Sequence, residues 1–216
     1  MSNPLLQLLV LGAIAVFLIL RLRGVLGTRD GFETPPRAPE EPVARKRFDV
    51  IDGDADNDIT DHAEPGSANA KALAEMKSVE PQFAVGPFLT GAKSAYEMIL
   101  MAFERGDLSA VRAFLAPPVA EAFESVIAER QARNLTTTAE FLGTRETALA
   151  EAEFNRATGM AELSVRFVGE MIVATRDADG NVVEGDPKAA RKQRDVWTFA
   201  RHMGEADPNW QLVATA

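Results

Sequence analysis

The residues that could perform chemistry are few in this chain. It contains two histidines, His62 and His202, and no cysteine. The lack of cysteine excludes disulfide frameworks, thiolate metal sites and thiol catalysis. His202 follows Arg201 near the end of an expected strand, and the sequence places no carboxylate beside it. We therefore interpret His202 as a rim residue rather than a general base, and we expect no catalytic, cofactor-binding or metal-binding residues.

One acidic run comes close to a metal-binding motif. Between Asp52 and Asp58, aspartates occupy the first, third, fifth and seventh positions of a calcium-loop pattern. The pattern then fails, because Asn57 stands where the loop needs glycine and Ala63 stands where it needs glutamate. We interpret this run as a solvated acidic linker.

The last third of the chain holds the candidate pocket residues. Trp197 and Phe199 lie at strand spacing, and with Arg166 they could line a pocket. Plain core packing is the more frequent role of such aromatic pairs. Arg166 shares a strand face with Glu162 and Glu170, and rows of this kind usually form a solvated face with cross-strand pairs.

Four bases within seven residues interrupt the acidic C-terminal part of the chain: Lys188, Arg191, Lys192 and Arg194. If an anchor keeps the domain near a membrane, these side chains could contact anionic lipid head groups. An ordinary exposed loop explains the same residues equally well, and the sequence leaves both interpretations open.

The elements that must position these residues begin, along the chain, with helices. Apolar residues recur at helical spacing from Thr90, a suitable N-cap, to Phe103. Asp107 is placed to cap a second helix, and Pro117-Pro118 to start a third that ends near Arg133.

Beyond residue 140 the apolar period changes to two, which is typical of strands. We expect a turn at Asp179-Gly180 and four main strands, at residues 148–155, 163–173, 196–203 and 210–214. Helices followed by an antiparallel meander predict an α+β fold, with about three helices packed on a four-stranded sheet. Gly169 predicts a bend or bulge that would curve this sheet into a cone.

The N-terminus has the composition of a membrane anchor. No residue from Pro4 to Leu20 is charged. Seventeen helical residues span roughly 25 Å, and flanking apolar residues extend them toward the thickness of a bilayer. A cleaved signal peptide would need basic residues before the apolar run and a small-residue cleavage site after it, and neither is present. We therefore predict a transmembrane anchor at residues 1–26.

A linker at residues 27–82 is expected to follow the anchor. It is rich in proline and acid and poor in large apolar residues, so burial could not offset the entropy of ordering it. Within it, residues 68–78 could form a short helix. The folded domain is expected at residues 83–216.

The negative net charge of the chain argues against one class of partner, nucleic acid. Acids outnumber bases 32 to 23 and the pI is about 4.9. Nucleic-acid binding by bulk positive charge is therefore not expected.

Five segments of the domain together resemble the Tim44-like domain family. They are Phe88–Glu97, Ala102–Asp107, Ser164–Glu170, Asp195–Arg201 and Pro208–Thr215. The resemblance implies a nuclear-transport-factor-two-like cone. The resemblance also implies an adaptor function, because one member of the family tethers the chaperone of the mitochondrial import motor to the inner membrane. Bacterial members, called TimA, combine an N-terminal anchor, a variable linker and this domain.

Two classes of function follow from these patterns. The first is a non-enzymatic, membrane-anchored adaptor that docks a chaperone, a translocating polypeptide or lipid. The second is a tethered cone-fold enzyme, or a protein that binds a small ligand or lipid in the cone. An anchor followed by a long linker favours the adaptor, because this arrangement raises the local concentration of a partner at the membrane.

The flanking charges predict the topology. Arg21, Arg23 and Arg29 follow the apolar run, so the positive-inside rule places the N-terminus outside and the domain in the cytoplasm of a bacterial cell, at its inner membrane. Protease added to intact spheroplasts should leave the C-terminal domain undigested. Digestion of that domain from outside would contradict the predicted orientation.

Overall fold

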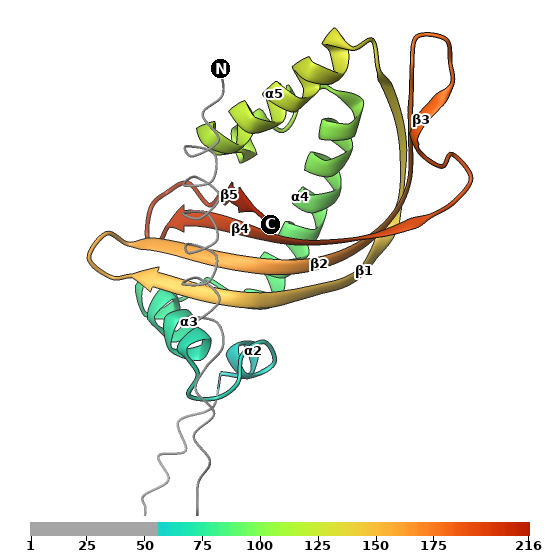
Figure 1. Cartoon of the computed structure of the whole chain (residues 1–216). Coiled ribbons are helices and arrows are strands. Elements are labelled where there is room, and N and C mark those ends of the chain that lie inside the picture. The colour runs from blue at the N-terminus through green and yellow to red at the C-terminus, as the bar shows by residue number, and fades with distance from the viewer. Residues whose placement is uncertain (1–55) are drawn as a thin grey trace, which may run out of the picture. The chain divides into compact units, whose positions relative to one another are not determined.

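The computed structural model describes residues 56–216 (Figure 1). The anchor predicted at residues 1–26 and the linker before residue 56 lie outside the described residues. Within residues 56–216, no helix combines the length and the apolar character that crossing a membrane requires.

Helices precede strands, and the fold is α+β as predicted. The helices are α2 (Asn57–Thr60), α3 (Ala68–Val79), α4 (Val85–Arg105), the 3-10 helix η1 (Arg112–Phe114) and α5 (Pro117–Ala132). The strands are β1 (Thr136–Asn155), β2 (Met160–Arg176), β3 (Val182–Gly185), β4 (Arg191–His202) and β5 (Gln211–Thr215).

The sheet is antiparallel, with the strand order β1-β2-β4-β5. The short strand β3 pairs with the far end of β2, which makes five strands where the sequence predicted four. The long strands bend around α4, and α4 and α5 lie on the concave side (Figure 1). The predicted curvature of the sheet is therefore present.

The centre of the core is Tyr96 of α4, which is fully buried against the sheet. Its ring stacks on Phe167 of β2 at 4.4 Å between centroids and meets the edge of Trp197 of β4 at 4.8 Å. Its hydroxyl donates a 2.5 Å hydrogen bond to Asp195, which satisfies the buried polar atom. Burial, together with this carboxylate, raises the pKa of Tyr96. A neutral phenol thus fixes α4 to the sheet.

Gly169 makes room for this ring. A Cβ atom at Gly169 would lie 3.0 Å from the Tyr96 hydroxyl, so the residue allows a close approach of helix to sheet. The sequence predicted a bend or bulge at Gly169. The sheet is curved (Figure 1), and the nearest register shift adjoins Thr144, the residue paired with Gly169. The register shifts lie in the neighbouring strand β1, between Phe141 and Gly143, Thr144 and Glu146, and Leu149 and Glu151.

The predicted linker is folded over its described part from Asn57 onward. The short helix expected at residues 68–78 is α3, and its Leu73 and Met76 are fully buried in the same core as the sheet. The side-chain amide of Asn69 donates to the carbonyl of Ala150 and accepts from the N–H of Ala152, both at 3.2 Å. It therefore occupies part of the free edge of β1, which would otherwise be open to another strand. The folded unit begins well before residue 83.

Two predicted helix starts were wrong. Helix α4 begins at Val85 rather than after Thr90, whose hydroxyl instead donates to the carbonyl of Gly86 one turn earlier. The carboxylate of Asp107 accepts a hydrogen bond from the N–H of Ser109 in a turn, and only the short helix η1 follows it. The apolar residues of that segment are nevertheless buried, as predicted.

Strand β1 begins at Thr136, twelve residues before the predicted strand at residues 148–155. Each bulge moves the following side chains to the opposite face, so the strand has no sustained apolar alternation. Its first half is also only partly buried. Both features remove the sequence signal on which the strand prediction depends.

Because α3 is packed in the core, we predict that it contributes to the stability of the domain. Leu73→Ala should lower the free energy of unfolding by about 2–5 kcal/mol, because it leaves a cavity in the core. The matched control is Val79→Ala at the end of the same helix, where the side chain is 43% exposed; it should change stability by less than about 0.5 kcal/mol. Urea denaturation of both variants measures the difference. Equal, small losses would show that α3 is not part of the folded unit.

Candidate functional site

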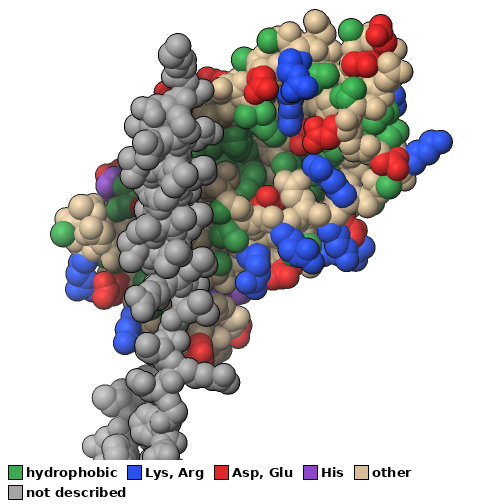
Figure 2. Space-filling view, in the orientation of Figure 1, with side chains coloured by type: hydrophobic (Ala, Val, Ile, Leu, Met, Phe, Trp, Pro, Cys, Tyr) green, Lys and Arg blue, Asp and Glu red, His purple; other side chains and the backbone are tan. Residues whose placement is uncertain are grey.

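An apolar groove lies between α4 and the segment that joins β4 to β5. Its volume is about 400 Å³. Hydrophobic side chains gather in a hollow on this face of the molecule (Figure 2). The apolar side chains that line the groove are Phe83, Pro87, Phe88, Ala92, Ala95, Met98, Phe114, Phe199, Pro208 and Trp210.

Aromatic contacts give the groove its shape. The ring of Trp210 lies 4.8 Å from that of Phe88 and 6.0 Å from that of Phe83, between centroids. Phe199 of β4 meets Phe88 edge to face at 6.1 Å. Met98 is 48% exposed, and its flexible thioether can adapt to different apolar surfaces. The groove therefore suits the apolar side of a ligand.

One partly buried ion pair, between Arg201 and Glu80, lies at one end of the groove. The guanidinium of Arg201 donates to Glu80 at 2.6 Å and to the carbonyl of Pro208 at 3.3 Å, and its carbon lies 5.2 Å from the centre of the Trp210 ring. The Nε atom of Arg201 is buried and has no partner among the described residues. Because Glu80 balances Arg201, the groove offers no uncompensated positive charge to an anion.

Glu80 joins the end of α3 to the sheet. Besides the bond from Arg201, it accepts a 3.2 Å hydrogen bond from the N–H of Gly204 in the turn after β4. The hydrogen bond from Arg201 lowers the pKa of Glu80, against the opposing effect of burial. The α3–α4 connection, which forms one wall of the groove, is thereby fixed at its first residue.

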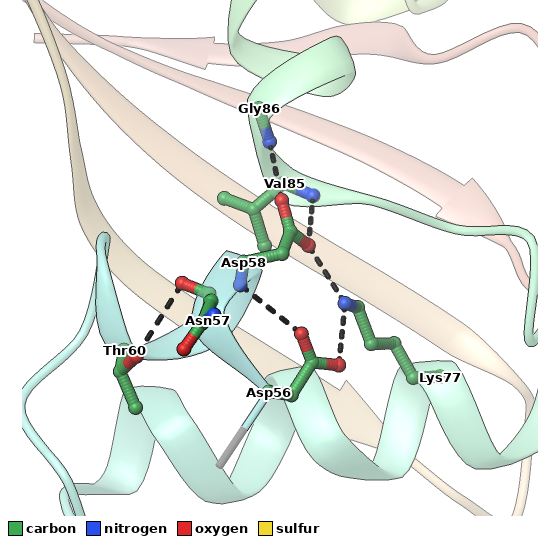
Figure 3. Close-up of polar contacts among 7 residues, drawn as sticks. All are labelled: Asp56, Asn57, Asp58, Thr60, Lys77, Val85 and Gly86. Atoms are coloured by element: carbon green, nitrogen blue, oxygen red, sulfur yellow. Dashed lines mark hydrogen bonds and ion pairs between the residues drawn. The ribbon is translucent and has the colours of Figure 1, made fainter. Parts of the chain in front are cut away.

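Asp58 fixes the other end of that wall (Figure 3). Its carboxylate accepts from the N–H groups of Val85 at 2.8 Å and Gly86 at 3.0 Å, at the N-terminus of α4. Lys77 of α3 contacts both Asp58 at 2.8 Å and Asp56 at 2.6 Å. Burial acts to raise the pKa of Asp58, but these hydrogen bonds outweigh it and the pKa is lowered.

The acidic run is thus partly structural rather than a solvated linker. Asp56 also caps α2 through the N–H of Asp58. Asp52 and Asp54 lie outside the described residues. Within residues 56–216, no group of three or more metal-ligating side chains is placed to hold a metal ion.

The three candidate pocket residues do not line one cavity together, although the ring centroids of Trp197 and Phe199 lie 6.4 Å apart. Phe199 lines the groove, but Trp197 is buried in the core behind it and is only 4% exposed. Arg166 lies on the opposite face of the sheet, where it pairs with Glu146 at 2.8 Å. Glu170 pairs with Arg145 at 2.6 Å on that face, and Glu162 is exposed there. This row is therefore a solvated face with ion pairs.

The four clustered bases do not form a single patch. Arg191, Lys192 and Arg194 belong to β4, and only Lys188 lies in the turn before it. Adjacent strand residues point to opposite faces, so Arg191 lies on the face opposite Lys192 and Arg194. All four are exposed. Contact of these side chains with lipid stays a prediction. It now concerns separate charges on β4 and in the turn before it, and not a single basic loop.

His202 is an exposed residue at the end of β4. Its Nδ1 lies 3.2 Å from the carbonyl oxygen of Thr158, and no Asp or Glu among the described residues is hydrogen-bonded to it. This position agrees with the rim interpretation of His202.

Sequence reasoning missed the residues that build the groove walls. Glu80 and Asp58 were assigned to the linker, and Arg201 was noted only as the neighbour of His202. The sequence offered no signal for Asp58, because the start of α4 at Val85, after an alanine that cannot cap it, was itself not predicted.

The Glu80–Arg201 pair predicts a pH-dependent contribution to stability. Because the pKa of Glu80 is lowered on folding, its contribution is present above the ordinary pKa and is lost as pH falls through the lower folded value. Glu80→Gln should cost about 1–3 kcal/mol at pH 7, and the difference from the unsubstituted protein should shrink toward pH 3. Urea midpoints at both pH values measure it, with exposed Glu205→Gln as control. A cost independent of pH would contradict this account of the ion pair.

No curated protein was found to match the chain. Among solved structures, the intermembrane space region of the chloroplast protein ARC6 is similar, with a TM-score of 0.39 and 11% identity, over 59% of this chain and 93% of that one. A model of the Tim44-like domain matches residues 69–216. The match begins within α3 rather than at residue 83, which agrees with the packing of that helix. The chain belongs to the Tim44-like domain family.

Proposed function

We propose that this protein is a non-enzymatic, membrane-anchored adaptor whose groove docks an apolar segment of a polypeptide, either a chaperone or a translocating chain. The observation that carries the proposal is the aromatic groove beside α4 in a domain of the Tim44-like family. An open apolar surface with a polar rim is typical of an interaction site.

Charges around the groove favour a polypeptide over an anionic head group. Arg201 is the cation that lines the groove, and Glu80 already neutralises it. Glu205 and Asp207 line the adjoining hollow, which shares Arg201 and Asn209 with the groove. A segment with an apolar face and basic flanks would complement this rim, whereas a phosphate would be repelled by it.

The buried acid–base candidates do not favour an enzyme. The strongest pair, Tyr96 and Asp195, is separate from the groove lining and is committed to holding α4 on the sheet. Catalysis needs convergent titratable groups in an accessible cavity. Arg201 and Glu80 are the titratable groups of the groove, and they serve to join α3 to β4.

The proposed function also uses the membrane anchor and the linker that the sequence predicts. The anchor at residues 1–26 would hold the domain at the cytoplasmic face of a bacterial inner membrane, as in a TimA-type protein. The linker before residue 56 would supply reach, so that docking occurs at a high effective concentration. The curved sheet with α4 on its concave side supports a nuclear-transport-factor-two-like cone.

Site-specific photo-crosslinking of the full chain in native membranes tests the docking surface. A p-benzoylphenylalanine is placed at Met98 in the groove and, in a separate variant, at Leu142 outside it; these side chains are 48% and 47% exposed. We expect a polypeptide adduct at Met98 in at least fivefold higher yield than at Leu142, with an apolar crosslinked segment flanked by Lys or Arg.

Two outcomes would contradict this proposal. Equal yields at Met98 and Leu142 would show that the groove is not the docking surface. Adducts at Met98 to lipid alone would favour the alternative function, a lipid-binding protein with its site in the groove.

A further inference from the structure

The groove has one wall that the body of the sheet does not supply. Glu80, Gln82, Phe83 and Ala84 line the groove, and they form the connection between α3 and α4. Phe83 is 7% exposed and contacts Trp210 on the opposite wall. The width of the groove therefore depends on where this connection is held.

The wall is attached at two points, and one of them comes from the region next to the linker. Glu80 attaches it to β4 and the following turn. Asp58, which lies in α2 and 27 residues before Val85, attaches it at the start of α4. Helix α4 has no side-chain cap of its own at Ala84, so Asp58 supplies the only side-chain acceptor that its first N–H groups have among the described residues.

Loss of this attachment would loosen the groove. Free N–H groups at the start of a helix lose both a hydrogen-bond acceptor and a favourable charge at the positive end of the helix dipole. The first turn of α4 carries Phe88, which packs against Trp210 and Phe199. Fraying of that turn would displace aromatic side chains from the groove lining.

We propose that the Asp58 cluster, formed by Asp56, Asp58 and Lys77, regulates the docking groove. With Asp58 seated on α4 the wall is ordered and the groove binds its polypeptide; with Asp58 displaced the wall frays and binding weakens. Because α2 is the first described element and follows residues that the sequence predicts to be a linker, a pull from that side, or a contact that removes α2, would be transmitted to the groove. This inference rests on the proposed docking function and adds the means by which docking is regulated.

Asp58→Asn in the full chain tests the coupling. The substitution keeps the shape of the side chain but removes the charge and replaces one acceptor oxygen by a donor. Amide hydrogen exchange should become at least tenfold faster at residues 80–88, whereas protection in β2 and β4 should be retained. The crosslink yield at Met98 should fall at least fivefold.

Two control variants separate this effect from charge and from general destabilisation. Asp61→Asn removes the same charge at an exposed residue of the same segment and should behave as the unsubstituted protein. Arg130→Gln breaks the 3.3 Å pair with Glu104 at the far end of α4, and it should leave exchange at residues 80–88 and crosslinking at Met98 within twofold of the unsubstituted protein.

If Asp58→Asn fails to fold, Lys77→Gln is the variant to measure, because it keeps the bonds from Asp58 to α4 and removes only the cation that holds the cluster together. It should raise exchange at residues 80–88 by a smaller factor, at least threefold. Exchange at these residues within twofold of the unsubstituted protein, in whichever variant folds, would overturn the coupling. If Met98 gives no adduct even without a substitution, the docking function fails, and the exchange measurement then decides the coupling alone.

Discussion

The residue before α4 offers no side-chain acceptor to the first N–H groups of the helix. The arrangement of the surrounding elements depends on the acceptor that replaces it. Ala84 offers no acceptor, so the carboxylate of Asp58 is brought in from α2. Hydrogen bonds from backbone N–H groups to a charged acceptor are among the stronger ones in proteins. This contact places α2 and α3 beside the start of α4, which extends the domain to residues before the predicted boundary.

The same helix connects the core to the groove. At its middle, Tyr96 is fixed on the sheet by ring stacking and by the hydrogen bond to Asp195, and Gly169 allows the close approach. The sheet therefore determines the position of α4. On either side of Tyr96, α4 contributes Phe88 and Met98 to the apolar groove, which Trp210 also lines. Helix α4 therefore contributes both to the core and to the groove that is proposed to dock a partner.

The sequence predicted most of the fold where apolar periodicity is strong. The pattern of β2 was clear because alternate residues are buried along its length, and the double proline marked the start of α5. Strand β1 was half missed because its bulges interrupt the alternation. Helix α3 was treated as marginal because only two large apolar residues, Leu73 and Met76, mark its buried face.

Little of the candidate site could be predicted. Phe199 was named as a possible pocket residue, with core packing the more frequent role, and it lines the groove. Arg166, named with it, lies on the other face of the sheet. The determining contacts join residues far apart in the chain, such as Asp58 with Val85 and Glu80 with Arg201. A single sequence carries no pattern that pairs a particular carboxylate with a distant amide or guanidinium.

The two tryptophans of the chain allow the most direct test of the central claim, that the groove is the docking surface. Trp210 lines the groove and Trp197 lies in the core. The indole N–H resonances of the full chain can be followed by NMR while the polypeptide segment recovered at Met98 is added as a synthetic peptide. Our account predicts that the Trp210 resonance shifts in a saturable manner while that of Trp197 stays in place. Saturable binding of this peptide with an unchanged Trp210 resonance would contradict it.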